Sequence, residues 1–259
     1  LYSITRFAVR KEFLFTRIVT NGVWYKNADD LRSCLERLFK SGYDGSFCLS
    51  VDAYHKQDME KVACFIRVAR SIWRRPDLVS IVYVTGRNNA TKKKLSKLAG
   101  RLKARLRCFG TRYAHIRSDS IFIKIGKVDL SPVGKARRIK DPWDGRWFRE
   151  DRCRGPGNLF FVEPSGEVKP CCGYASESPA LSIGNIKRDP VSRIVENARQ
   201  NRIVYAIFNS GLSGIRKRLG GCGVKFPGKT SNNCFFCHYI LERYGKKIRS
   251  LYHPGSHPV

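Results

Sequence analysis

Two groups of cysteines have the residue type and the spacing to hold a metal centre. The first group lies in the stretch from Cys153 to Cys172, and the second is the pair Cys234 and Cys237, about sixty residues later. Two cysteines three positions apart can share a centre within a single turn, and thiolates bind zinc as well as iron-sulfur clusters. The sequence therefore predicts a thiolate metal site built from these two groups.

A hairpin is expected to position the first group. An apolar run from Leu159 to Val162 leads into Pro164, Ser165 and Gly166, where proline suits the second position of a turn and glycine the fourth. A second short strand then returns and carries Cys171 at its end. Such a hairpin would bring the Cys171 thiol to a fixed place, which a metal site requires.

The amino-terminal half alternates short apolar runs with amphipathic segments. Helices are expected to begin at Asn27 and to run over 57–73 and about 90–106. Alternating strands and helices imply parallel pairing through right-handed crossovers, hence an α/β fold with an open sheet or a partial (β/α) barrel. The predicted strands are Arg17–Thr20, Ser46–Val51, Val79–Val84 and Ser120–Ile125.

Small polar residues follow each predicted strand. In parallel α/β layers the carboxyl ends of the strands carry function, although the same residue types also make turns and helix caps. Among these polar residues, Asp52 is the strongest candidate for a binding site, because Tyr54 and His55 follow it and could help to hold a polar ligand.

The chain is strongly basic, with 50 Lys and Arg against 21 Asp and Glu, a net charge of +29. Such a charge favours anionic partners such as nucleic acid, an acidic carrier or an anionic peptide. The basic residues are scattered, however, and their brief clusters at 92–94, 137–138 and 246–247 form no stripe. The sequence alone therefore marks no path for a nucleic acid.

Composition and cysteine usage predict a folded protein of a reducing compartment. Hydrophobic residues make up 42% of the 259 residues, enough to bury a core. The ten cysteines follow no small-domain disulfide framework, and the sequence shows neither a signal peptide nor a long apolar run. We expect a cytoplasmic location and no membrane association.

The order of motifs resembles the radical S-adenosylmethionine (SAM) enzymes. The segments 20–22, 50–55, 88 and 131–136 resemble the ends of strands three to six of the barrel in that family. The region from Cys153 resembles the start of its SPASM or twitch extension, whose pattern of Cys, about a dozen residues, Gly, four residues and Cys is met by Cys153, Gly166 and Cys171. The segment 181–186, followed by a helix near 191–198, resembles the part after the first cluster hairpin, and Cys234 with Cys237 matches the later Cys-x-x-Cys.

The resemblance implies a domain division and a set of cofactors. A partial barrel would occupy residues 1–140, and an auxiliary cluster domain, a small Cys-rich α+β domain, would occupy 146–259. Ser50, Asp52 and Asn88 would lie near SAM or the substrate. An auxiliary [4Fe-4S] cluster would bind substrate or carry an electron in an oxidoreductase.

Two departures from the family limit what the resemblance implies. The Cys-x3-Cys-x2-Cys motif that binds the SAM-cleaving cluster is absent, and in the family it precedes the point where this sequence begins. We therefore expect the carboxyl-terminal part of a radical SAM enzyme rather than a degenerate relative. No cysteine follows Cys237, so one auxiliary cluster is expected rather than two.

The ligand set of that cluster can be weighed from the residues. Four thiolates, apolar cover and hydrogen bonds to sulfur suit a [4Fe-4S] cluster, and the cover would come from Phe160, Phe161, Phe235 and Phe236. Cys172 is either an alternate ligand or a structural thiol, Cys222 is a further candidate or a plain loop cysteine, and His238 is a weaker one. Buried, unliganded thiols are expected at Cys34, Cys48, Cys64 and Cys108. The predicted ligands are Cys153, Cys171, Cys234 and Cys237.

A zinc-binding basic module that binds nucleic acid is the alternative from another class. Zinc accepts the same thiolates, and the strongly basic chain suits such a module. Zinc modules usually present Cys-x2-4-Cys twice, whereas only Cys234 and Cys237 have that spacing here. The spacing therefore favours iron-sulfur chemistry over zinc.

Overall fold

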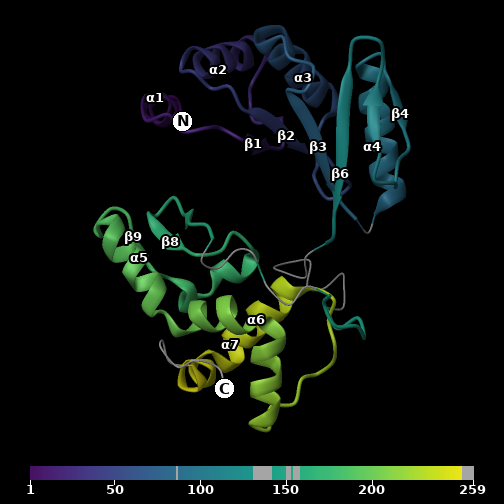
Figure 1. Cartoon of the computed structure of the whole chain (residues 1–259). Helices are drawn as coiled ribbons and strands as arrows, with labels where there is room; N and C mark the ends of the chain where they lie inside the picture. Colours follow the sequence, from purple (N-terminus) through teal and green to yellow (C-terminus); the bar gives the residue numbers. More distant parts are fainter. Residues whose placement is uncertain (86, 131–141, 150–152, 154–157, 253–259) are drawn as a thin grey trace. The chain divides into compact units, whose positions relative to one another are not determined.

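The protein consists of two compact units, Leu1–Leu130 and Ser131–Val259. The computed structural model describes residues 1–85, 87–130, 142–149, 153 and 158–252 (Figure 1). Each unit has a hydrophobic core of its own. The predicted domain limits of 1–140 and 146–259 stay a prediction, because the stretch 131–141 lies outside the described residues.

Unit 1 alternates helices and strands along the chain. Asn27 caps the second helix by accepting a hydrogen bond from the backbone N–H of Asp30 (2.9 Å), and Asp58 caps the third through Glu60 (2.9 Å). The elements are α1 (Tyr2–Arg10), β1 (Arg17–Thr20), α2 (Ala28–Lys40), β2 (Ser46–Ser50), α3 (Met59–Trp73), β3 (Val79–Val84), α4 (Asn88–Arg101), β4 (Arg105–Arg107), β5 (His115–Arg117) and β6 (Phe122–Val128).

The strands of unit 1 form one mixed sheet in the order β1-β2-β3-β6-β5-β4. The first four strands are parallel, as the alternating pattern predicts, and β5 and β4 extend the sheet in antiparallel fashion. A helix is present where one is expected over about 90–106, but its predicted end is wrong. The helix α4 ends at Arg101, and Leu106 lies in β4. Among the described residues the sheet is open, with β1 and β4 at its edges, and does not close into a barrel.

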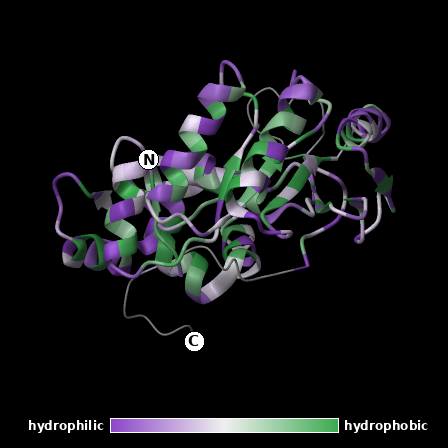
Figure 2. Ribbon diagram, turned by 90° about the horizontal axis from the view of Figure 1, so that it is seen from above, coloured by the Kyte–Doolittle hydropathy of each residue, from purple (hydrophilic) through white to green (hydrophobic). Residues whose placement is uncertain are grey.

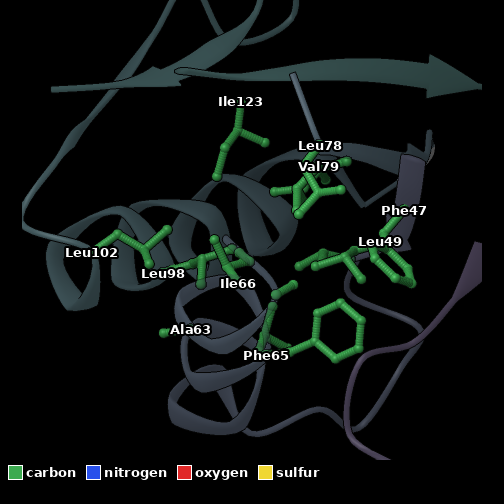
Figure 3. Packing of buried hydrophobic residues seen from close by; sticks show 14 of the residues in the cluster. Phe47, Leu49, Ala63, Phe65, Ile66, Leu78, Val79, Leu98, Leu102 and Ile123 are labelled. Atoms are coloured by element: carbon green, nitrogen blue, oxygen red, sulfur yellow. The ribbon is translucent and has the colours of Figure 1, made fainter. Parts of the chain in front are cut away.

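The core of unit 1 lies between the sheet and its helices. Phe47 and Leu49 of β2 pack with Phe65 and Ile66 of α3, while Leu98 of α4 lies in the same cluster (Figure 3). Each such side chain, once buried, stabilises the fold by about 1.5–3 kcal/mol. The helices combine green apolar and purple polar residues in Figure 2, as helices with one buried face do.

Unit 2 joins a small antiparallel sheet, in the order β7-β8-β9, to three helices. The predicted turn is confirmed: the N–H of Gly166 donates to the carbonyl of Glu163 (2.8 Å), with Pro164 second and Gly166 fourth in the turn. The elements are β7 (Phe161–Val162), β8 (Glu167–Lys169), the 3-10 turns η2 (Tyr174–Glu177) and η3 (Pro179–Leu181), β9 (Gly184–Asn185), α5 (Val191–Gln200), α6 (Arg202–Gly221) and α7 (Asn233–Leu251).

The helices of unit 2 supply most of its core. Within α6 the backbone leaves helical geometry at Gly211 (φ +64°), and α7 begins at the cap Asn232, whose side chain accepts from the N–H of Phe235 (2.9 Å). Phe236 and Ile240 of α7 are fully buried against α6. None of the helices in the described ranges combines the length and the apolar character that crossing a membrane requires.

Candidate metal centre

Two elements of unit 2, β8 and α7, position three of the four predicted cysteine ligands. Cys171 follows β8 at the end of the hairpin, and Cys234 and Cys237 are the second and fifth residues of α7. Cys171 and Cys237 are buried, whereas Cys153 and Cys234 are partly buried. The Asn232 cap fixes the start of α7 and thereby the place of both thiols on that helix.

Gly173 lies close to two of the sulfurs. A Cβ atom at this position would stand 3.0 Å from the Sγ of Cys234 and 3.6 Å from the Sγ of Cys171. The backbone N–H of Gly173 also donates a hydrogen bond to the Sγ of Cys171 (3.3 Å). The chain thus leaves room for two sulfurs and supplies one of them with a donor.

Burial and mutual repulsion raise the pKa values of the clustered thiols. Burial is the largest cause for Cys171 and Cys237, and for Cys234 it raises the pKa from 9.0 to about 11. The charges of Cys153 and Cys171 act on Cys234 and Cys237 in the same direction. The four predicted ligands therefore share one electrostatic environment, in which thiolates are unfavourable without a cation.

The thiols share an electrostatic environment, but their side chains are not arranged in the coordination geometry of a metal ion. Across the described ranges, no group of three or more His, Cys, Asp or Glu side chains is already arranged to hold a single metal ion. Unit 2 instead shows the Sγ atoms of Cys171 and Cys234 close to Gly173, and electrostatic interactions that link the four predicted ligands.

Aromatic side chains cover part of the site. Phe235 and Phe236 are buried as expected. Phe160 and Phe161 are 48% and 41% exposed, so their role as cover stays a prediction. Three rings that the sequence analysis missed pack on Phe236 at centroid distances of 5.3–5.6 Å: Trp147, Phe148 and Phe226.

Polar groups on α7 and η2 lie beside the thiols. The hydroxyl of Tyr174 donates to Oδ1 of Asn232 (3.1 Å), which ties η2 to the start of α7. His238 is buried next to Cys237, and its Nε2 lies 3.0 Å from Oε1 of Glu242. The imidazole therefore has a carboxylate neighbour one turn further along α7.

The remaining cysteines lie in different surroundings. Cys172 is exposed, yet its charge acts on Cys171 and Cys234, so it belongs to the same region. Cys222 is exposed at the end of α6, where its carbonyl accepts from Nζ of Lys247 (2.8 Å). Cys48 is buried and Cys34 and Cys64 are partly buried, but Cys108 is exposed, so its predicted burial is wrong.

The predicted cofactor residues of unit 1 lie at strand ends, and Asp52 is engaged within the protein. Its buried carboxylate accepts from the N–H of Tyr54 (2.8 Å) and pairs with Nδ1 of His55 (2.8 Å), while Oδ2 accepts from Val84 on β3 (3.4 Å). The carbonyl of Ser50 accepts from Gln57 (2.7 Å), and Asn88 is exposed at the start of α4. A cofactor role for Ser50, Asp52 and Asn88 stays a prediction.

Two further residues at this edge were missed by the sequence analysis. The hydroxyl of Thr91, fully buried on α4, accepts from the N–H of Ala53 (3.1 Å). Nζ of Lys94 donates to the carbonyl of Asp52 (3.0 Å) and also to that of His55. Both lie on the helix that the pattern predicts over about 90–106, and only the contact between α4 and the end of β2 in the folded chain identifies them.

Comparison with known families identifies part of unit 2. Residues 153–223 match the SPASM iron-sulfur cluster-binding domain. This match confirms the resemblance that begins at Cys153, and it includes Gly166 and Cys171 but ends before Cys234. No curated protein matches the chain.

Proposed function

We propose that this chain binds one [4Fe-4S] cluster through Cys153, Cys171, Cys234 and Cys237. The observation that carries the proposal is the convergence on Gly173, where two sulfurs approach a position without a side chain and one receives a backbone N–H. The SPASM match shows iron-sulfur binding as the general property of residues 153–223. The [4Fe-4S] type of the cluster and its four ligands are part of our proposal.

The surroundings fit the chemistry of such a cluster. Four thiolates, apolar cover and hydrogen bonds to the sulfurs are what a [4Fe-4S] cluster needs. Unit 2 offers the four thiols, the buried rings of Phe235 and Phe236, and the Gly173 donor. A bound cluster would supply one-electron transfer or a site for substrate, at a potential set by this environment.

The protein's own part is to hold thiols that are costly to ionise without a metal. Because burial raises the pKa values of Cys171, Cys234 and Cys237, each keeps its proton in the metal-free protein at neutral pH. Metal binding must therefore release protons from these sulfurs. This coupling makes the loaded state sensitive to pH.

The parent activity we propose is that of a radical SAM enzyme. The SPASM match and the α/β unit before it support this assignment. In it, Ser50, Asp52 and Asn88 would lie near SAM or substrate, while the chain itself contributes the auxiliary cluster. SAM cleavage uses a Cys-x3-Cys-x2-Cys motif that the 259 residues do not contain, so we do not assign that step to them.

A panel of Cys→Ser variants tests the ligand set. After anaerobic reconstitution with iron and sulfide, Cys171→Ser and Cys237→Ser are expected to lose most of the visible cluster absorbance, because each removes a buried ligand. Cys172→Ser and Cys222→Ser are the matched controls, since both thiols are exposed, and they should keep the absorbance of the unmodified chain. If Cys172→Ser loses as much absorbance as Cys171→Ser, the proposed ligand set is wrong.

A further inference from the structure

The antiparallel end of the sheet in unit 1 presents an unusual outer face. Along β4, Arg105 and Arg107 alternate with Leu106, and β5 and β6 alternate in the same way. Strand register places Arg105 opposite Arg117, Arg107 opposite His115, His115 opposite Lys124 and Arg117 opposite Phe122. These residues therefore share one side of three neighbouring strands. We name the set the basic sheet face: Arg105, Arg107, His115, Arg117, Phe122 and Lys124.

The opposite side of the same strands belongs to the core. Ile116, Ile123 and Ile125 are buried there, and Leu106 packs against them. A shift of one residue in register would bury the arginines, so the pattern is strongly fixed. The basic sheet face accordingly points away from the core, and all its members are exposed except the partly buried His115.

Carboxylates compensate little of the charge on this face, although the charge of Lys124 acts on the carboxylate of Asp77. Like charges directly opposite each other on neighbouring strands destabilise a sheet, yet Arg105 faces Arg117. Within the described part of the chain, none of the arginines of the face and no ammonium of Lys124 forms an ion pair with a carboxylate. An anionic partner bound to this face would relieve the repulsion between the arginines.

Aromatic side chains stand among the cations. Phe122 is 40% exposed, and its ring lies 5.3 Å from that of His115, whose Nδ1 is 2.7 Å from the carbonyl of Tyr113. Tyr113, just before β5, is 74% exposed. Exposed rings beside Arg and Lys form a platform on which unpaired bases stack while phosphates meet the cations.

We propose that the basic sheet face binds single-stranded nucleic acid. Charge complementarity selects a polyanion, and the exposed rings favour bases over the side chains of an acidic peptide. Double-stranded nucleic acid fits less well, because its bases are not free to stack on Phe122 or Tyr113. The inference is independent of the metal centre, since it uses unit 1 alone.

A binding titration tests the proposal. A labelled oligouridylate of about ten nucleotides is titrated with the full chain, and fluorescence anisotropy measures its affinity at several KCl concentrations. If the four cations of the face each meet a phosphate, the logarithm of affinity should fall with the logarithm of salt at a slope of about −2.8. A slope near zero would overturn the proposal.

Variants locate the binding. The double variant Arg105→Gln/Arg117→Gln should make the slope shallower by about 1.4, because two phosphate contacts are lost. Lys92→Gln/Lys93→Gln is the matched control, because it removes the same charge from the exposed side of α4 and should leave the slope nearly unchanged. Equal losses from the two double variants would overturn the assignment to this face.

Phe122→Ala separates base stacking from charge attraction. It should weaken oligouridylate binding by at least about fivefold without changing the salt slope. Thermal melting of each variant confirms that the exposed substitutions leave the fold intact. If oligoglutamate of equal charge binds as tightly as oligouridylate and Phe122→Ala changes neither, the partner is an acidic peptide and the proposal is wrong.

Discussion

At the scale of single residues, Gly173 decides whether two sulfurs can converge. Its backbone angles (φ −80°, ψ 166°) are open to any residue, so conformational freedom is not the reason for glycine here. The reason is space, because a Cβ would stand 3.0 Å from the Sγ of Cys234. That distance makes the position testable by a single methyl group.

Gly173→Ala is predicted to reduce the iron content of the reconstituted protein. The added methyl group must push Cys234 or the η2 turn aside, so the cluster should be lost faster on exposure to an iron chelator. Gly245→Ala on α7 is the control, because its Cβ meets nothing within 4 Å. Equal rates of iron loss in both variants would show that the thiols do not depend on the space at Gly173.

The raised pKa of Cys234 predicts how the stability of the metal-free protein changes at alkaline pH. Its folded pKa of about 11 lies above its ordinary value of 9.0, so between these values the folded state holds more protons than the unfolded state. Its contribution to stability is complete below pH 9 and declines as pH rises toward 11. Urea unfolding midpoints of the metal-free protein should therefore fall over this range, and fall less in Cys234→Ser. The same fall in both proteins would count against the burial of this thiol.

Asp52 shows what residue types alone leave open. A carboxylate followed by tyrosine and histidine at a strand end predicts a polar site, and the three residues do lie together. The structure adds that backbone N–H groups and His55 already satisfy this carboxylate, and that one donor, Val84, comes from the next strand. Strand register determines that contact, and no local pattern in the sequence reports it.

At the scale of elements, strong periodic signals were predictable and short ones were not. The four parallel strands alternate with amphipathic helices, the hairpin turn carries a proline-glycine signature, and all of these elements are present. β4 and β5 have three residues each, with one apolar residue between two basic ones, which is too little for a period-two pattern. Missing these two strands also concealed the basic sheet face, because it forms only when they align with β6.

The hairpin β7–β8 is predicted to control the placement of Cys171. At Gly166 (φ +90°) a Cβ would meet Oδ1 of Asn185 at 2.7 Å and Cγ of Lys187 at 3.0 Å. Gly166→Ala should therefore lower stability by more than the ~1 kcal/mol cost of the left-handed backbone alone, and lower iron content as well. The measurement is the urea midpoint together with iron per chain.

Gly223→Ala provides the comparison for this hairpin. Gly223 has a similar positive φ (+81°), but nothing lies within 4 Å of its Cβ position. The Gly223→Ala substitution should therefore lower stability only by the backbone strain and leave the iron content unchanged. A Gly166→Ala protein that behaves like Gly223→Ala would mean that the hairpin does not set the position of Cys171.

At the scale of the whole molecule, two units with separate cores hold the two proposed binding sites. Unit 2 concentrates the thiols and matches a cluster-binding domain, while unit 1 carries polar strand ends and the basic sheet face. The net charge of +29 predicts an anionic partner in general but locates none, since its residues are scattered along the sequence. Only the fold gathers some of them onto one surface.

The most direct test of the central claim is the metal and acid-labile sulfide content of protein purified without oxygen. We predict about four iron and four sulfide per chain, with the broad brown absorbance of a [4Fe-4S] cluster. One zinc per chain without sulfide would contradict the account, because the same thiolates would then form a structural zinc site.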